Sequence, residues 1–135
     1  MSIILVDTNI ASFIFKVSDY AESYEVLLNG HELALSFMSV AELYQWAFIR
    51  KWGDRRIIQL EKYLSNYLII PTDHLLCQEW AKLRAESQQI GRAISSQDAW
   101  IASTAIRHNL ELVTHNLKDL QGLPKLRHHS SIIND

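Results

Sequence analysis

Four acidic residues stand at places in the sequence where a carboxylate has chemical use. Asp7 follows directly on the apolar run 3–6, and Glu42 comes shortly after a second β-like run. Asp98 opens a helix-like segment, and Asp119 follows the last internal β-like run. Because aspartate is a poor strand residue and is seldom buried alone, Asp7 needs a cation, a helix N-terminus or a basic group beside it.

The chemistry that suits four convergent carboxylates is the binding of a hard divalent cation. Like charges held close together repel, and some must be protonated unless a cation neutralises them. Mg²⁺ is held by a few carboxylates together with water and substrate phosphate, and Mn²⁺ suits the same oxygen ligands. If the strands are parallel, the acids meet at the carboxyl edge of one sheet, where ligands of open α/β sheets collect. The pattern then predicts a Mg²⁺ or Mn²⁺ site for phosphoryl chemistry.

Two of these acids also have a purely structural interpretation as parts of helix caps. Ser39 and Glu42 have the spacing of a capping box, in which Glu42 reaches back to the backbone N–H of Ser39. Ser95 and Asp98 form a weaker version of the same pattern. Each acid taken singly fits a cap, whereas the set of four favours a shared site.

Caps are also an alternative for the first and last acids. Asp7 fits as the cap of a turn formed by Thr8 and Asn9. Asn116 with Asp119 resembles a capped helix start. The capping interpretation is weakest for Asp7, because a buried strand leads directly into it.

The elements that must position these acids alternate between short apolar runs and amphipathic stretches. The β-like runs cover residues 3–6, 33–36, 67–70 and 110–114, with an edge strand expected at 130–133. Helical periodicity fills residues 19–29, 40–51, 55–65, 74–89 and 97–108. This alternation predicts an α/β fold, a single domain over residues 1–135 with a central, mainly parallel sheet of four to five strands flanked by helices.

Composition limits the remaining possibilities. The formal net charge of −2 argues against binding nucleic acid through bulk positive charge, but not against reaching phosphate through bound cations. Cys77 is the only cysteine, which excludes an intramolecular disulfide and a cysteine-based metal site, and its apolar surroundings predict a core position. No apolar run is long enough for a membrane span and the start lacks a signal peptide, so we expect a cytoplasmic protein without membrane contact.

Four motifs resemble those of PIN-domain nucleases, and more narrowly those of VapC-type ribonuclease toxins of toxin–antitoxin pairs. They are LVDTNI at 5–10, SVAELYQWA at 39–47, SSQDAWIASTAI at 95–106 and LVTHNLKDL at 112–120. They occur in the family's order and spacing, and with the segments between them they cover nearly the whole chain. The resemblance implies a PIN-like fold.

The resemblance also assigns residues to roles. Metal binding and catalysis fall to four acids: Asp7, Glu42, Asp98 and Asp119. Thr114 and Asn116 are expected to support the site, with Asn116 the alternative to Asp119 in the fourth role. Thr8 and Asn9 are expected to present Asp7, and Thr8 to hydrogen-bond a site carboxylate.

The activity implied is hydrolysis of RNA with Mg²⁺, for which Mn²⁺ substitutes, leaving a 5′-phosphate and a 3′-hydroxyl. The implied partners are an RNA substrate, a cognate antitoxin that places an Arg or Lys among the carboxylates, and a second copy of the chain. Two alternatives stay open: a nuclease of the same fold that processes RNA or cleaves DNA, and a non-catalytic partner-binding module.

Basic residues interleaved with tryptophans are candidates for gripping single-stranded RNA. The stretch WAFIRKWGDRR at 46–56 contains four of them: Arg50, Lys51, Arg55 and Arg56. A solvated helical face with inward tryptophans, or a partner surface, is the alternative explanation. Arg92, six residues before Asp98, is a candidate for binding substrate phosphate or for capping a loop.

Overall fold

Strand β1 (Ile3–Val6) lies at the centre of a parallel sheet, and its side chains alternate between two cores. In the computed structural model, which describes residues 2–115, 120 and 128–130, Ile4 and Val6 belong to one buried cluster and Leu5 to the other. Successive side chains of a strand point to opposite faces, so a strand covered on both sides must be apolar throughout. The uninterrupted apolar run before Asp7 has this cause.

The described sheet has five strands in the order β3-β2-β1-β4-β5, and every neighbouring pair is parallel. The other strands are β2 (Glu32–Ser36), β3 (Leu68–Ile70), β4 (Glu111–Thr114) and β5 (His128–Ser130). The predicted α/β fold with a mainly parallel sheet is confirmed. The edge strand β5 begins two residues before the predicted run, and residues 131–133 of that run lie outside the described residues.

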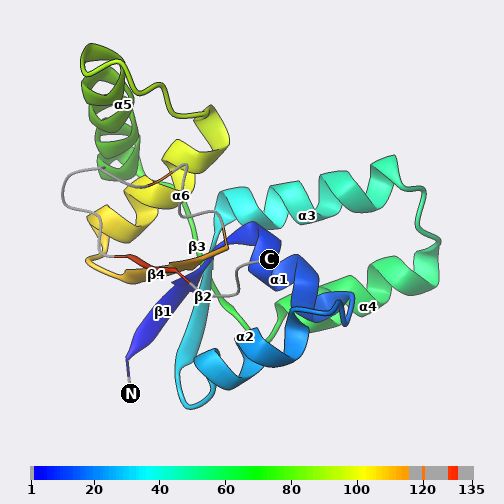
Figure 1. Ribbon diagram of the computed structural model, residues 1–135. Coiled ribbons are helices and arrows are strands. Elements are labelled where there is room, and N and C mark those ends of the chain that lie inside the picture. Colours follow the sequence, from blue (N-terminus) through cyan, green and yellow to red (C-terminus); the bar gives the residue numbers. More distant parts are fainter. Residues whose placement is uncertain (1, 116–119, 121–127, 131–135) are drawn as a thin grey trace.

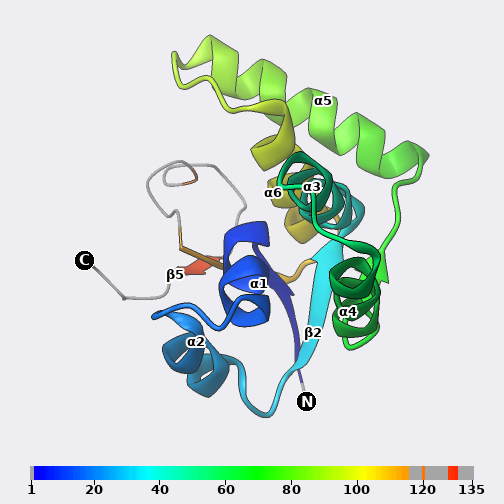
Figure 2. The same cartoon turned by 90° about the vertical axis from the view of Figure 1, so that its right-hand side faces the viewer.

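Helices cover both faces of this sheet (Figure 1). They are α1 (Thr8–Phe15), α2 (Ala21–Leu28), α3 (Phe37–Ile49), α4 (Asp54–Leu64), α5 (His74–Gln89) and α6 (Ser96–Arg107). The first four contribute buried side chains to the cluster that contains Val6, and α5 and α6 contribute to the cluster that contains Leu5. Figure 2 shows α1, α2 and α4 gathered away from α5, with α3 beside α6. The result is a three-layer arrangement.

Helix α1 is the element that the sequence pattern does not predict. The pattern indicates only a turn at Thr8 and Asn9, but these residues open a helix whose N-cap is Asp7. At eight residues the helix is too short to be stable alone, so its cap and its packing must hold it. Ile10 and Ala11 are fully buried against the sheet and supply that packing.

Helix α5 corrects a smaller prediction. Cys77 is exposed, and the neighbouring Leu76 takes the buried position predicted for Cys77. In the part of the chain that the structure describes, no helix combines the length and the apolar character needed to cross a membrane.

Candidate active site

The Asp7 carboxylate is held by hydrogen bonds to both of its oxygens. Its backbone N–H still donates to the Val113 carbonyl at 3.0 Å, so the residue remains attached to β4 as the chain turns into α1. Oδ1 accepts the Thr8 backbone N–H at 2.7 Å, and Oδ2 accepts the Thr114 hydroxyl at 2.6 Å. The residue is only 6% exposed. Its orientation is therefore fixed from two neighbouring segments of the chain.

Glu42 is not part of a capping box. Helix α3 begins at Phe37, and its N-cap is Ser36, whose hydroxyl accepts the Met38 backbone N–H at 3.1 Å. Ser39 lies inside the helix, so the predicted cap at Ser39 is wrong. The Glu42 side chain, which is half-buried, turns instead toward α1 and accepts the Thr8 hydroxyl at Oε1, 2.9 Å away.

Thr8 connects these two acids. Its hydroxyl has one proton, which is donated to Glu42, so the Ser39 hydroxyl 2.7 Å away is the donor in the second bond to Thr8 Oγ1. The backbone N–H of Thr8 donates to Asp7. The predicted hydrogen bond from Thr8 to a site carboxylate is thus present. The part of Ser39 in this chain of bonds was missed, because the sequence pattern placed Ser39 at a helix cap.

Asp98 lies in the first turn of α6, where Ser95 is the N-cap. The Ser95 hydroxyl accepts the Asp98 backbone N–H at 3.1 Å, so the serine half of the predicted capping pattern is confirmed. The negative charge of Asp98 acts on both Asp7 and Glu42. The structure therefore brings the three predicted acids to the same carboxyl edge of the sheet.

Burial is the main reason that the pKa of Asp7 lies above its ordinary value. The bonds from Thr114 and Thr8 oppose this rise, and the charge of Asp98 adds to it. The pKa of Glu42 is also raised, again first by burial and then by the charges of Asp7 and Asp98, with the Thr8 bond opposing. Two acids that are costly to ionise side by side indicate a site suited to a compensating cation.

Asp7, Glu42 and Asp98 offer carboxylate oxygens, which are the ligands that a hard cation prefers. Among residues 2–115, 120 and 128–130, however, no three His, Cys, Asp or Glu side chains converge closely enough to hold a metal ion as they stand. The fourth predicted acid, Asp119, and its alternative Asn116 lie outside the described residues. Asn9, a further predicted supporting residue, is the second residue of α1 and is half-buried.

His115 follows Thr114 and packs among aromatic rings. Its ring centroid lies 4.8 Å from that of Tyr20 and 5.0 Å from that of Phe13, and its Nδ1 hydrogen-bonds the Tyr24 hydroxyl. These contacts are consistent with a structural role for this histidine.

Four of the five predicted RNA-binding residues lie between the end of α3 and the first turn of α4. Arg50, Lys51 and Arg55 are exposed near the ends of α3 and α4, while Arg56 is half-buried. Arg92 is exposed between α5 and α6, and its backbone N–H donates to the Ser87 carbonyl at 2.8 Å.

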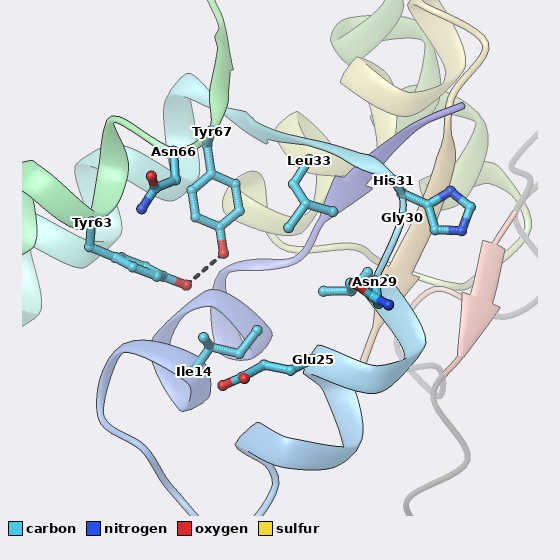
Figure 3. Close-up of a pocket in the computed structure, with 10 residues that line it drawn as sticks. Ile14, Glu25, Asn29, Gly30, His31, Leu33, Tyr63, Asn66 and Tyr67 are labelled. Atoms are coloured by element: carbon cyan, nitrogen blue, oxygen red, sulfur yellow. Dashed lines mark hydrogen bonds between the residues drawn. The ribbon is translucent and has the colours of Figure 1, made fainter. Parts of the chain in front are cut away.

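A separate pocket of about 290 Å³ lies at the opposite edge of the sheet (Figure 3). Its walls include Leu33 near the start of β2, Ile14 of α1 and Glu25 of α2. The hydroxyls of Tyr63 and Tyr67 lie 2.5 Å apart beside it, and burial raises the pKa of both. Because Asp7 follows the other end of β1, this pocket does not belong to the carboxylate site.

Comparison with known proteins agrees with this fold. The PIN domain family model matches residues 4–125. Ribonuclease VapC2 of Rickettsia felis is 31% identical over 92% of this chain and 94% of its own. Ribonuclease VapC1 of Haemophilus influenzae strain R2866 is 30% identical over 93% of this chain and 95% of its own. The crystal structure of VapBC2 from Rickettsia felis, bound to a DNA fragment from its promoter, matches with a TM-score of 0.84 at 30% identity, covering 96% of this chain and 98% of that chain. The chain belongs to the PIN-domain family and, within it, to the VapC-type ribonucleases.

Proposed function

We propose that this chain is a metal-dependent endoribonuclease toxin whose activity is silenced by a cognate antitoxin. The observation that carries the proposal is the convergence of Asp7 and Glu42 on Thr8, with the charge of Asp98 acting on both. The names of the relatives, which are ribonucleases, support RNA as the substrate class.

Asp7, Glu42 and Asp98, with Asp119 as the predicted fourth acid, would hold Mg²⁺ or Mn²⁺. A bound divalent cation supplies an activated water and neutralises charge on the phosphate during hydrolysis. The predicted products are a 5′-phosphate and a 3′-hydroxyl.

The chain's own residues orient the charges that this chemistry needs. Thr114 and Thr8 fix the two Asp7 oxygens, so the carboxylate loses little further freedom when a cation binds. The Thr8 hydroxyl fixes Oε1 of Glu42, which leaves Oε2 as the oxygen that would bind a cation. No histidine base is part of this mechanism.

The partner is proposed on the same family grounds. The solved VapBC2 assembly of Rickettsia felis contains a toxin and an antitoxin, and we propose an antitoxin of this kind for the present chain. An Arg or Lys of that antitoxin among the carboxylates would replace the cation's charge. We also propose that the chain forms a homodimer and acts in the cytoplasm, where RNA substrates are found.

Cleavage of total cellular RNA tests the function directly. The purified chain is incubated with Mg²⁺ or Mn²⁺ beside Asp7→Asn and Glu42→Gln, and the product ends are mapped. Glu86→Gln, which removes an exposed acid from α5, is the matched control. We expect discrete cuts with 5′-phosphate ends from the wild type and the control only. Cutting by Asp7→Asn at the wild-type rate would refute the mechanism, and cutting of DNA alone would favour the alternative nuclease.

A further inference from the structure

Three cationic side chains from three helices gather at the far end of the α1 and α3 pair. Lys16 is the C-cap of α1, Arg50 is the C-cap of α3, and Arg56 lies in the first turn of α4. Partial desolvation and then the positive charges of Arg50 and Arg56 hold the pKa of Lys16 below its ordinary value. Lys16 therefore lies close enough to both arginines to be repelled by them. We call this group the basic cluster.

Arg56 is held in place within the basic cluster by two aromatic rings. Its guanidinium carbon lies 4.6 Å from the centroid of the Trp52 ring and 5.1 Å from that of Phe15. A stacked guanidinium keeps its N–H groups at the edge of its plane, where they match a phosphate group. Stacking also means that little side-chain freedom remains to be lost when an anion binds.

Within the part of the chain that the structure describes, no carboxylate forms an ion pair with a member of the basic cluster. The ion pair among the described residues joins Arg107 to Asp73. A cation at a helix C-terminus is stabilised by the helix dipole, which explains Lys16 and Arg50 separately. It does not explain why Lys16 and Arg50 lie close enough to repel each other or why Arg56 joins them from α4. An anion that binds among the three relieves their repulsion.

The basic cluster has a regular relationship to the carboxylate site. Lys16 stands eight residues after Thr8, and Arg50 stands eight residues after Glu42. With a helical rise of 1.5 Å per residue, both cations lie about 12 Å along their helices from the Thr8–Glu42 bond. The two helices lead away from the same edge of the sheet (Figure 1), and the Thr8–Glu42 bond joins them near their starts.

We propose that Lys16, Arg50 and Arg56 form a subsite for a backbone phosphate of the single-stranded RNA that is cut at the carboxylate site. This inference rests on the proposed function, because it takes the scissile phosphate to lie at Asp7. The acids repel a polyanion when no cation is bound, so the strand needs a positive anchor at a distance. A phosphate contact of this kind raises affinity for every RNA sequence and selects none.

The test measures RNA binding by the full chain in which Asp7→Asn prevents cutting. Fluorescence anisotropy of a labelled single-stranded RNA is recorded without divalent metal at several KCl concentrations. Lys16→Gln with Arg50→Gln removes two cations of the basic cluster, and Lys62→Gln with Lys82→Gln removes two exposed cations outside it as the matched control. For each phosphate that the protein no longer neutralises, the slope of log affinity against log salt becomes shallower by about 0.7. If parent and variant bind equally at 1 M salt, the variant therefore binds about fivefold more weakly than the parent at 0.1 M salt. We expect this decrease in the first pair and a clearly smaller one in the control pair.

Each other result is informative. A slope unchanged by the first pair, or changed equally by both pairs, overturns the subsite. Binding of a labelled polyglutamate peptide is measured in the same way. If the first pair loses binding to this peptide but keeps RNA binding, the basic cluster binds an acidic protein segment and the RNA subsite is overturned. If the wild type with Mg²⁺ fails to cut RNA while the first pair still weakens RNA binding, the proposed function fails and the binding subsite stands. Cutting by the wild type with an unchanged slope gives the reverse conclusion.

Discussion

The Thr8 hydroxyl lies 2.9 Å from Glu42 Oε1 and ties the first turn of α1 to α3. The backbone N–H of the same residue lies 2.7 Å from Asp7 Oδ1. Thr8 is 3% exposed, so both bonds form away from bulk water, where hydrogen bonds are strong and unpaired groups are costly. A residue that is not an acid thus sets the relative position of two acids.

Replacing Thr8 with valine is expected to reduce both stability and activity. Valine keeps the shape and the backbone bond to Asp7 but leaves Glu42 and Ser39 without the hydroxyl that joins them. Stability should fall by about 1–3 kcal/mol, the cost of unpaired buried polar groups. RNA cleavage should fall about 10–100-fold, as for other residues that orient metal ligands.

Thermal unfolding and initial cleavage rates measure these two effects, and Thr8→Ser is the matched control. Serine retains the hydroxyl, so most of the activity should return. A Thr8→Ser variant as weak as Thr8→Val would show that the methyl group, and not the bond to Glu42, matters at this position.

The bond from Thr114 to Asp7 is expected to set the acid limb of the pH–rate profile. The Thr114 hydroxyl opposes the rise that burial causes in the pKa of Asp7, so Thr114→Val should raise that pKa further. A larger fraction of Asp7 is then protonated at any moderately acidic pH, and protonated Asp7 cannot bind a cation. The acid limb should move to higher pH in Thr114→Val and stay in place in Thr114→Ser. If the acid limb stays in place in both variants, the Thr114–Asp7 bond does not influence the ionisation that limits activity at low pH.

Asp7→Asn should stabilise the protein when metal is absent. A carboxyl whose pKa is raised on folding favours the folded state when protonated, and this contribution is lost as pH rises through the raised pKa. At pH 7 the ionised Asp7 therefore destabilises the metal-free fold, and its replacement by asparagine should add about 1 kcal/mol, or about 4 °C in Tm. The difference between the two proteins should vanish as pH falls toward 3.8, the usual aspartate value. A variant less stable than the wild type at pH 7 would contradict this account of Asp7.

Divalent metal should reverse that order of stability. If Asp7 binds Mg²⁺ or Mn²⁺, a metal concentration of 100 times Kd stabilises the wild type by about 2.7 kcal/mol. Asp7→Asn should gain much less at the same ionic strength. Differential scanning fluorimetry with a sodium chloride control measures both. Equal gains in the two proteins would place the metal elsewhere.

Asp7 and its strand were predictable because the signal is local. A strand covered on both faces must be apolar along its length, so the run that ends at Asp7 indicated a buried strand followed by a charge that needs a partner. The parallel sheet then followed from the alternation of elements. Helix α1 did not follow, because eight residues held by a cap and by two buried side chains carry little periodic signal.

The contacts that assemble the site were not predictable from the sequence. The true cap of α3 is Ser36, three residues before the expected Ser39, because the helix starts directly after β2. The Thr8–Glu42 bond depends on how two helices pack, and no local pattern reports on that. Lys16 is an isolated basic residue in the sequence, and only the packing of α1 against α3 and α4 brings it to Arg50 and Arg56.

The bond from Thr114 to Asp7 spans 107 residues, almost the length of the chain. Chains are synthesised from the N-terminus at about 5–20 residues per second, so Asp7 is added to the chain roughly 5–20 s before Thr114. During that interval β1 also lacks β4, its neighbour on one side. A nascent chain therefore carries an unassembled site, and we expect that it does not cleave the RNA of the ribosome or the message from which it is made. If the chain has the proposed activity, that activity begins only after Thr114 has been added, and the proposed antitoxin can act on the assembled site from that point.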